Sequence, residues 1–224
     1  KFNQFNSSVN QLKDLLDIKY IDNDGVYKGK KCVVVASGGS VLDNKLGDEI
    51  DEFDLIVRTN LAQYEGFEKH VGSRTDVRFL SHKAFGNTLS NVDFSSYDVD
   101  YIPNSNSHLI IRSVGNIGSM IPGFILNQDG KNKFSILDLD YNTYLDRQLN
   151  TGHYCTVGFS AVHTMMDLGC EVYIYGFDFY NESTSYHYYE KVSKKAQTGR
   201  ANHPMKNEKV YFDYLMATDK IKRL

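Results

Sequence analysis

Two histidines late in the chain stand in contexts that could support proton transfer. His187 opens a run of four residues that ends in Glu190, and His203 precedes Glu208 by five positions. An imidazole has an ordinary pKa of about 6.5, so at neutral pH it is mostly free base and can accept a proton from a hydroxyl. Each pairing alone is a weak signal, because a histidine near a glutamate is common. The remaining histidines are interpreted as surface or packing residues: His70, His82, His108, His153 and His163.

Two short turns earlier in the chain have a composition suited to holding a phosphate. Ser37-Gly38-Gly39-Ser40 consists of small residues that tolerate positive φ and expose backbone N–H groups. Thr156 to Gly158 stand where a helix is predicted to begin, and the unpaired N–H groups and positive dipole end there favour an anion. Both turns have simpler alternatives. The first could be an ordinary β-turn after a core strand, and Thr156 could be a helix cap alone, worth about 1 kcal/mol.

The elements that position these turns form an α/β pattern. One apolar strand ends at Ser37 and another ends in Arg58-Thr59-Asn60, which is typical of an open sheet that builds a nucleotide crevice at its carboxyl edge. The predicted strands are Cys32–Ala36, Leu55–Val57, Val77–Leu80, Leu109–Ile111, Ile136–Leu137 and Glu171–Tyr175. The predicted helices are Lys45–Glu52, a turn at Tyr144–Leu149, and Phe159–Leu168, with Phe159, Val162 and Met166 on one face and Gly169 as its stop.

Length and composition indicate a single domain over residues 1–224. An amphipathic helix within residues 1–30 is expected to pack on the sheet, and residues 179–202 are predicted to form a mobile lid that carries His187. The net charge of −3 and pI near 6.2 argue against a nucleic-acid partner, which would need a basic face. No apolar run reaches the length of a membrane span and no signal peptide is present, although an anchor outside this chain is left open.

The stretch from Cys32 to Thr75 resembles the long sialyl motif of the eukaryotic-type sialyltransferases, glycosyltransferase family 29. Ser37 departs from that motif, because an Asn is usual there. The matching residues are Cys32, Val34, Val35, Gly39, Glu49-Ile50-Asp51, Asp54, Arg58, Asn60, Gly66-Phe67-Glu68, Val71-Gly72 and Arg74-Thr75.

Three further motifs of the same family follow in the family's order. Tyr154 to Gly158 resembles the start of the short sialyl motif, with Cys155 in place of the usual Pro, and 16 residues separate Gly158 from Tyr175-Gly176-Phe177. The run that begins at His187 resembles the third motif, and His203 with Glu208 resembles the last, very short one. The resemblance covers the chain from Cys32 to the C-terminus.

This resemblance implies a single Rossmann-like nucleotide-sugar transferase domain, a GT-A-like variant with a mostly parallel central sheet flanked by helices. It implies inverting transfer of sialic acid from CMP-sialic acid to a glycan hydroxyl in a single in-line displacement, without cofactor or metal. His203 would be the general base, His187 would steady the leaving phosphate, and Glu208 would orient local structure. The donor-binding residues implied are Ser37, Gly38, Gly39, Asn60, Tyr154, Thr156, Val157, Gly158 and Gly176.

Metal and disulfide chemistry are considered separately. Asp98-Val99-Asp100 and Asp138-Leu139-Asp140 spell the Asp-x-Asp pattern that metal-dependent glycosyltransferases use, but both are interpreted as solvated charges, and no metal site is predicted. The family joins its two sialyl motifs by a disulfide. Cys32 stands at the first of those positions and Cys170 one residue beyond the second, while three buried free thiols, with Cys155 as the third, are the favoured interpretation.

Two other functions remain open at this point. CMP-Kdo could replace CMP-sialic acid on the same fold, and the chain could be a non-catalytic module that binds a CMP-sugar or a glycan. A dinucleotide-dependent dehydrogenase is disfavoured, because Gly-x-Gly-x-x-Gly does not follow the first strand. The compartment is also open: the Golgi lumen if the chain follows its family, the cytoplasm if it is microbial.

Overall fold

The computed structural model describes residues 19–20, 25–81, 107–112, 133–137, 139–179, 185, 187–189 and 203–224. Its strands are β1 (Lys19–Tyr20), β2 (Lys31–Val35), β3 (Leu55–Thr59), β4 (Val77–Leu80), β5 (His108–Arg112), β6 (Lys133–Leu137), β7 (Glu171–Tyr175) and β8 (Ile221–Arg223). Its helices are the 3-10 helix η1 (Gly39–Asp43), α2 (Gly47–Asp51), α3 (Glu68–Val71), α5 (Leu139–Gln148), α6 (Val157–Asp167) and α8 (Met205–Ala217).

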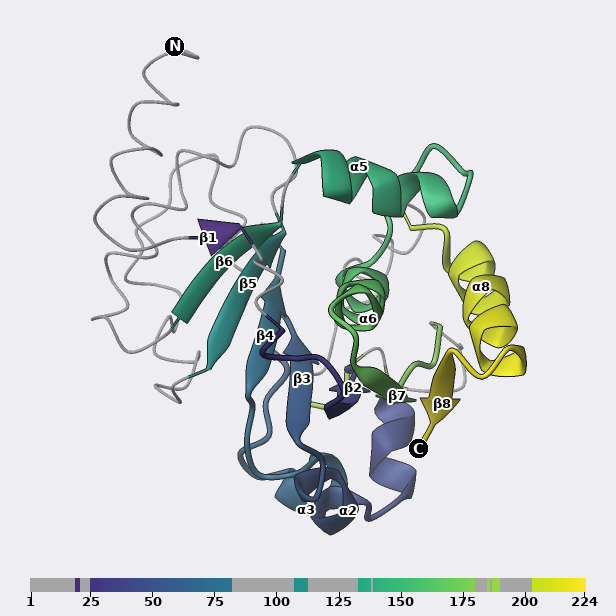
Figure 1. Ribbon diagram of the computed structural model, residues 1–224. Coiled ribbons are helices and arrows are strands. Elements are labelled where there is room, and N and C mark those ends of the chain that lie inside the picture. Colours follow the sequence, from purple (N-terminus) through teal and green to yellow (C-terminus); the bar gives the residue numbers. More distant parts are fainter. Residues whose placement is uncertain are drawn as a thin grey trace, which may run out of the picture.

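All of these strands belong to one parallel sheet, in the order β1-β6-β5-β4-β3-β2-β7-β8 (Figure 1). From β2 the chain advances through β3, β4, β5 and β6 in one direction, whereas β7 and β8 lie on the other side of β2. In open parallel sheets a ligand binds at such a switch point, beyond the carboxyl ends of the two strands. Here that place is marked by the turns that follow Val35 and Tyr175.

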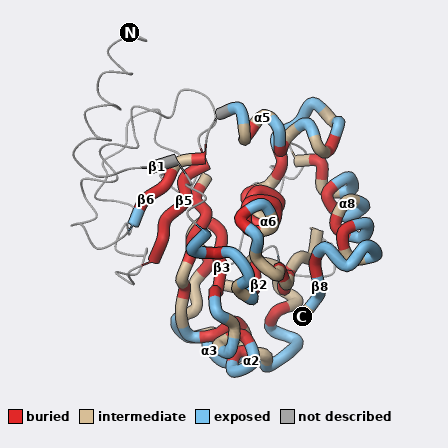
Figure 2. Tube along the Cα trace, viewed as in Figure 1, coloured by how far each residue is buried: buried red, intermediate tan, exposed pale blue. Residues whose placement is uncertain are grey.

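The alternation of side chains along β2 divides the core between the two faces of the sheet. Cys32 and Val34 belong to the cluster that receives the side chains of α6 and α8, while Val33 and Val35 pack with residues of α2 and α3. Helices therefore cover both faces, which explains why the strands read as continuous apolar runs. Figure 2 shows the buried residues along the strands and in α6.

The predicted strands are all present, and the α/β fold is confirmed. Val77–Leu80 and Glu171–Tyr175 have the predicted bounds, and the other predicted strands are displaced or extended by one to three residues at their ends. Gly169, with φ +82°, follows α6 as predicted and occupies the left-handed region that glycine adopts without a side-chain clash.

Two predicted helices differ from the structure. The turn predicted at Tyr144–Leu149 belongs to the longer helix α5. The apolar face predicted for α6 is buried, with Met166 only partly so, but it is only part of the buried surface of this helix, which also includes Ser160, His163 and Thr164. A central helix covered by the sheet on one side and by other helices on the other loses the simple amphipathic pattern.

Several predictions fall on other parts of the chain. Lys19–Tyr20 form a strand paired with β6, so they are not part of the helix predicted within residues 1–30. Residues 1–18 and most of the predicted lid at 179–202 lie outside the described residues.

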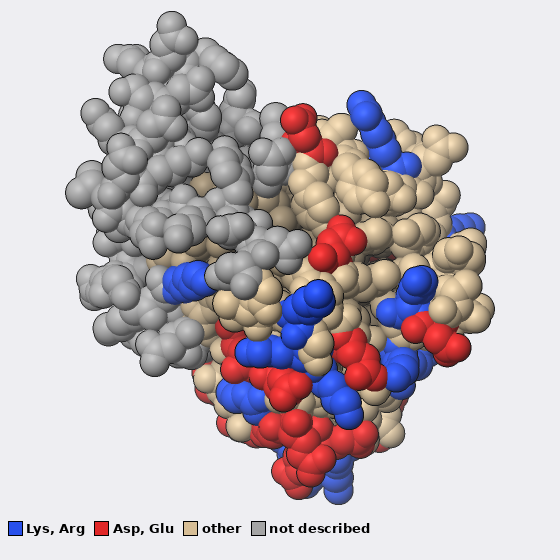
Figure 3. All heavy atoms as spheres, in the orientation of Figure 1, with Lys and Arg blue, Asp and Glu red and all other residues tan. Residues whose placement is uncertain are grey.

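On the face shown in Figure 3, Lys and Arg are interleaved with Asp and Glu over the region of α2 and α3. Among the helices described, none combines the length and apolarity needed to cross a bilayer.

Candidate active site

The turn after β2 is held tightly by the segment that follows β7. The Gly38 amide donates to the Gly176 carbonyl at 3.1 Å, and the Gly39 amide donates to the Ser185 carbonyl at 3.0 Å. The Ser40 amide donates to Asp178 Oδ2 at 3.0 Å. The prediction that this turn leaves its amides exposed is therefore wrong for these three residues, because folding pairs them within the protein.

The glycines of this turn allow that close packing. A Cβ on Gly38 would lie 2.5 Å from both the Gly176 carbonyl oxygen and Asp178 Cγ, and one on Gly39 would lie 2.7 Å from the Ser185 amide nitrogen. No heavier residue fits without moving one of the two segments. Gly176 itself has φ +72°, and its own Cβ would lie 2.5 Å from Val41 Cγ1. The turn thus depends on backbones that approach each other directly.

The turn before α6 is capped twice. Thr156 is the N-cap residue, and its Oγ1 accepts the Phe159 amide at 3.1 Å. Glu208, from α8, accepts the Thr156 amide at 2.6 Å through Oε1 and the Thr156 hydroxyl at 2.8 Å through Oε2. The predicted cap at Thr156 is confirmed, and the carboxylate that secures it comes from the last motif.

Glu208 is buried almost completely, with 1% of its surface exposed. Burial raises the pKa of this carboxyl to about 7, while the two hydrogen bonds from Thr156 oppose that rise because they favour the charged form. The sequence interpretation of Glu208 as a residue that orients local structure agrees with this position.

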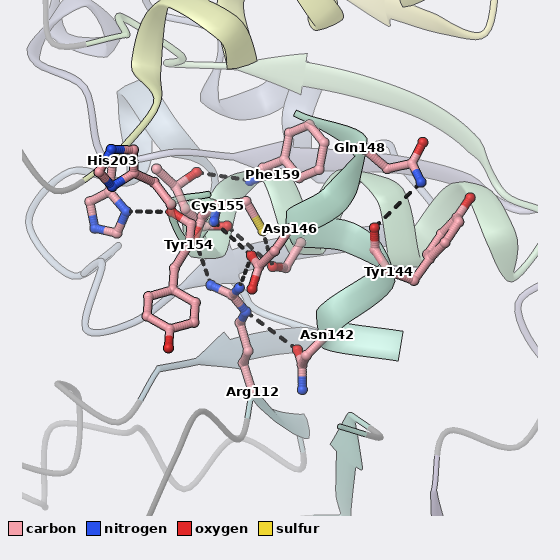
Figure 4. A network of polar contacts seen from close by, with 12 residues as sticks. Arg112, Asn142, Tyr144, Asp146, Gln148, Tyr154, Cys155, Phe159 and His203 are labelled. Atoms are coloured by element: carbon pink, nitrogen blue, oxygen red, sulfur yellow. Dashed lines mark hydrogen bonds and ion pairs between the residues drawn. The ribbon is translucent and has the colours of Figure 1, made fainter. Parts of the chain in front are cut away.

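His203 lies against the same turn. Its Nδ1 is 3.0 Å from the Tyr154 carbonyl oxygen (Figure 4). A carbonyl oxygen can only accept, so Nδ1 carries the hydrogen and Nε2 keeps its lone pair in the neutral ring. Tyr154, whose carbonyl holds the imidazole, is 63% exposed. The arrangement leaves Nε2 as the atom able to accept a proton.

His187 lies beside the other turn. The Tyr188 amide donates to the Ser37 carbonyl at 3.0 Å, which fixes the neighbouring His187 there. Tyr188 is buried, its hydroxyl donates to the Gln63 carbonyl, and its ring meets Phe67 edge to face with centroids 5.1 Å apart. The His187 ring stacks on Tyr189 with centroids 5.0 Å apart.

Asn60 follows β3, the neighbour of β2, in a left-handed conformation with φ +48°. Its Oδ1 accepts the Ser81 amide at 3.0 Å, and its carbonyl accepts from Arg78 Nη1 at 2.7 Å. The Asn60 side-chain oxygen is therefore used within the protein.

Two buried arginines, Arg58 of β3 and Arg78 of β4, hydrogen-bond to the segment between these strands, including Thr75. The sequence analysis assigned neither of them a functional role. Arg58 donates to the Val71 carbonyl at 2.6 Å and, like Arg78, to Thr75 Oγ1. Burial lowers the pKa of Arg78 to about 10, and the adjacent Arg58 guanidinium adds to that shift. A single arginine within each of two otherwise apolar strands is the signal that could have revealed them.

The two predicted turns meet at Gly176-Phe177, beyond the carboxyl ends of β2 and β7. The first turn is bonded to Gly176, and a Cβ on Gly158 would lie 2.9 Å from Phe177 Cε1, so the second turn touches the same segment. Because His187 is attached to the first turn and His203 to the second, each imidazole lies beside one of the two turns that meet at Gly176-Phe177.

Metal and cysteine predictions give two further results. In the described part of the chain, no three His, Cys, Asp or Glu side chains are grouped so as to hold a metal. Asp140 is exposed in the first turn of α5, and Asp98, Asp100 and Asp138 lie outside the described residues.

The cysteines described are all free thiols. The hydrogen bond that the buried Cys32 thiol donates to Cys170 is the main cause that raises the pKa of Cys32 well above its ordinary value, with burial second, so these two thiols are neighbours. The favoured interpretation of free thiols agrees with this structure, although Cys170 is half-buried.

Comparison with known proteins decides the family. The model of glycosyltransferase family 29, the sialyltransferases, matches residues 1–220. The chain belongs to glycosyltransferase family 29. The resemblance of the four sialyl motifs is confirmed by this match over nearly the whole chain.

Curated relatives within the sialyltransferase family are similar at moderate identity. Rat type 2 lactosamine alpha-2,3-sialyltransferase is 27% identical over 84% of this chain and 62% of its own length. Human CMP-N-acetylneuraminate-beta-1,4-galactoside alpha-2,3-sialyltransferase is 28% identical over 84% of this chain and 55% of its own length. Mouse lactosylceramide alpha-2,3-sialyltransferase is 33% identical over 44% of this chain and 23% of its own length. The chain thus spans less than two thirds of the length of these relatives.

Solved structures agree on the fold. A crystal structure of a mammalian sialyltransferase superposes with a TM-score of 0.68 at 20% identity, covering 98% of this chain and 78% of that one. A second, in complex with Gal-beta-1-3GalNAc-ortho-nitrophenol, gives a TM-score of 0.65 over 98% of this chain and 79% of that one. The fold of the family is therefore present in this chain.

Proposed function

We propose that this chain transfers sialic acid from CMP-sialic acid to a hydroxyl of a galactose-terminated glycan, with inversion and without a metal. Membership of family 29 supports this reaction class. The observation that carries the proposal is the junction of the short and the last sialyl motifs, in which His203 donates to Tyr154 and Glu208 receives two hydrogen bonds from Thr156. His203, the proposed base, and the N-terminus of α6, the proposed anion site, are thereby both bonded to residues 154–156.

The proposed mechanism assigns one role to each imidazole. His203, whose Nδ1–H donates to the Tyr154 carbonyl, accepts the proton of the acceptor hydroxyl at Nε2. His187 donates to the phosphate of the departing CMP, on which negative charge accumulates. The Val157 and Gly158 amides, which precede the capped Phe159 amide in α6, would face the same charge, because a helix N-terminus favours an anion. The leaving group is a monophosphate, so no diphosphate needs a bridging metal.

The acceptor part of the proposal rests on the relatives. The human relative's name specifies a beta-1,4-galactoside and the rat relative's a type 2 lactosamine, and one crystal structure holds a Gal-beta-1-3GalNAc derivative. A terminal galactose is common to these compounds. We therefore take galactosides as the acceptor class to be tested first.

The test is release of CMP from CMP-sialic acid and from CMP-Kdo, in parallel, with lactosamine, lactose and Gal-beta-1-3GalNAc acceptors. CMP-sialic acid is the expected donor, and the product should form at the same rate in excess EDTA and with the opposite anomeric configuration by NMR. His203→Ala should lower kcat by about 10²- to 10⁴-fold, the usual contribution of a general base. His70→Ala is the matched control, because His70 Nδ1 also contacts a backbone carbonyl, that of Asn44 at 2.5 Å.

The outcomes separate the rival functions. Release from CMP-Kdo alone would replace the donor while keeping the mechanism. Binding of CMP without transfer to any acceptor would favour a non-catalytic CMP-sugar module. Undiminished transfer by His203→Ala would remove the base assigned here.

A further inference from the structure

An ion pair outside the four sialyl motifs holds the backbone at Cys155, between Tyr154, which bonds to His203, and Thr156. Arg112, at the end of β5, is 4% exposed, and its Nη2 lies 2.6 Å from Asp146 Oδ1 of α5. Arg112 Nε also donates to Asn142 Oδ1 at 3.3 Å. Figure 4 shows this guanidinium between α5 and the turn before α6.

Both members of the pair bond to the backbone of Cys155. Asp146 Oδ1 accepts the Cys155 amide at 2.8 Å, and Arg112 Nη1 donates to the Cys155 carbonyl at 2.5 Å. The Cys155 thiol is buried and its pKa is raised to about 12, chiefly by burial, so the backbone of this residue rather than its side chain makes the connection.

Four hydrogen bonds to this segment fall on two consecutive peptide groups. In the Tyr154–Cys155 peptide the N–H donates to Asp146 and the carbonyl accepts from His203. In the Cys155–Thr156 peptide the carbonyl accepts from Arg112 and the N–H donates to Glu208. Two successive peptide planes are thus held at both ends by charged or ionisable side chains.

We propose that Asp146 and Arg112 are positioning residues for the transfer reaction, and that Asp146 orients and polarises His203 through the single peptide between Tyr154 and Cys155. A peptide whose N–H donates to a carboxylate is a stronger acceptor at its carbonyl, because hydrogen bonds in a chain polarise one another. The stronger Nδ1–H bond holds the imidazole in one tautomer and stabilises its protonated form, as a carboxylate does in direct contact with a histidine. Arg112 fixes the carboxylate and offsets its charge beside the turn where an anionic donor is expected.

This inference rests on the proposed function for its kinetic consequence but not for its structural one. Asp146→Asn and Arg112→Lys should each lower kcat by about 10- to 100-fold, the usual cost of removing a group that orients a catalytic residue. The KM for CMP-sialic acid should change by less than about threefold, because Glu208 still holds Thr156. The ¹⁵N chemical shifts of His203 in the free protein should show the Nδ1–H tautomer in wild type and a mixture in Asp146→Asn, with a lower imidazole pKa in that variant.

Matched variants separate positioning from general destabilisation. Ile110→Ala removes a buried side chain from the same face of β5 as Arg112, and Glu171→Gln breaks the exposed pair with Lys222, which lies at 2.5 Å. Neither should alter kcat or the His203 shifts at a temperature where all variants are folded.

The His203 measurements test this inference even if CMP-sialic acid is not the donor. If wild type transfers no sialic acid, the proposed function fails while the His203 tautomer still tests the inference. Unchanged His203 shifts and pKa in Asp146→Asn would overturn it. So would a kcat within about twofold of wild type in an active enzyme, or an equal loss in Ile110→Ala.

Discussion

Glu208 accepts both the amide and the hydroxyl hydrogen of Thr156, and it does so from a helix 52 residues further along the chain. Thr156 Oγ1 already accepts the Phe159 amide, so its own hydrogen is directed at the Glu208 carboxylate. One carboxylate therefore sets the hydroxyl orientation of the helix cap and ties α8 to α6. Because His203 immediately precedes α8, the same contact also anchors the segment that carries it.

The raised pKa of Glu208 predicts a pH-dependent stability. The ordinary value of 4.5 applies to the unfolded chain and about 7 to the folded one, so between these values the folded state binds more protons. The free energy of unfolding should therefore fall as pH rises from 4.5 to 7, by up to ~3 kcal/mol from this group, and then level off. Urea unfolding of wild type and Glu208→Gln across that range measures it, and the variant should lose this part of the slope.

Glu171→Gln is the control for this slope, because Glu171 is an exposed carboxylate whose pKa is lowered by Lys222 and lies below the range tested. It should leave the slope unchanged. Equal slopes in wild type and Glu208→Gln would contradict the prediction.

The positions of the strands could be predicted from the sequence because both faces of the sheet are covered. The strands from β2 to β7 are then mostly apolar, as in Cys32 to Val35, although Arg58 and Arg78 interrupt β3 and β4. Such runs are recognisable without knowledge of their partners. The helix cap at Thr156 was equally accessible, since a threonine before an apolar helix is a local signal.

The internal partners of the site were not accessible, because they come from distant segments. Gly38 is required by the carbonyl of Gly176, more than a hundred residues away, and nothing near Gly38 in the sequence indicates that its amide is paired. The Arg112–Asp146 pair lies between the family motifs, so neither the local pattern nor the resemblance pointed to it.

Close packing at Gly38 predicts a loss of donor binding when a methyl group is added. Gly38→Ala would place Cβ 2.5 Å from the Gly176 carbonyl oxygen. We expect a loss of about 1 to 3 kcal/mol in stability, the usual cost of overpacking, and weaker CMP binding by calorimetry, because the two turns are forced apart. Gly25→Ala is the comparison: φ is +77° there but the space is open, so it should cost stability through backbone strain alone and leave CMP affinity unchanged.

The thiols should differ sharply in reactivity under reducing conditions. Cys170 is half-buried, and the hydrogen bond with Cys32 lowers its pKa, whereas Cys32 and Cys155 are buried with raised pKa values. The thiolate is the reacting form, so Cys170 should be alkylated first by iodoacetamide in the folded protein. Peptide mapping by mass spectrometry identifies the labelled residue, and Cys170→Ser should abolish the rapid phase. Rapid labelling of Cys155 instead would contradict the assignment.

The anchor beneath His187 should affect donor binding more than stability. Tyr188→Phe removes the hydroxyl that donates to the Gln63 carbonyl while keeping the ring against Phe67. The lost bond should cost about 1 kcal/mol of stability, and the freed His187 segment should raise the KM for CMP-sialic acid several-fold. Tyr141→Phe is the matched control, because it deletes a phenol that donates to Asp167 at 2.7 Å on the outer side of α6, away from the two turns. An equal rise of KM in both variants would mean that Tyr188 acts on the fold in general, whereas a rise in Tyr188→Phe alone would place its effect on His187 and the turn at Ser37.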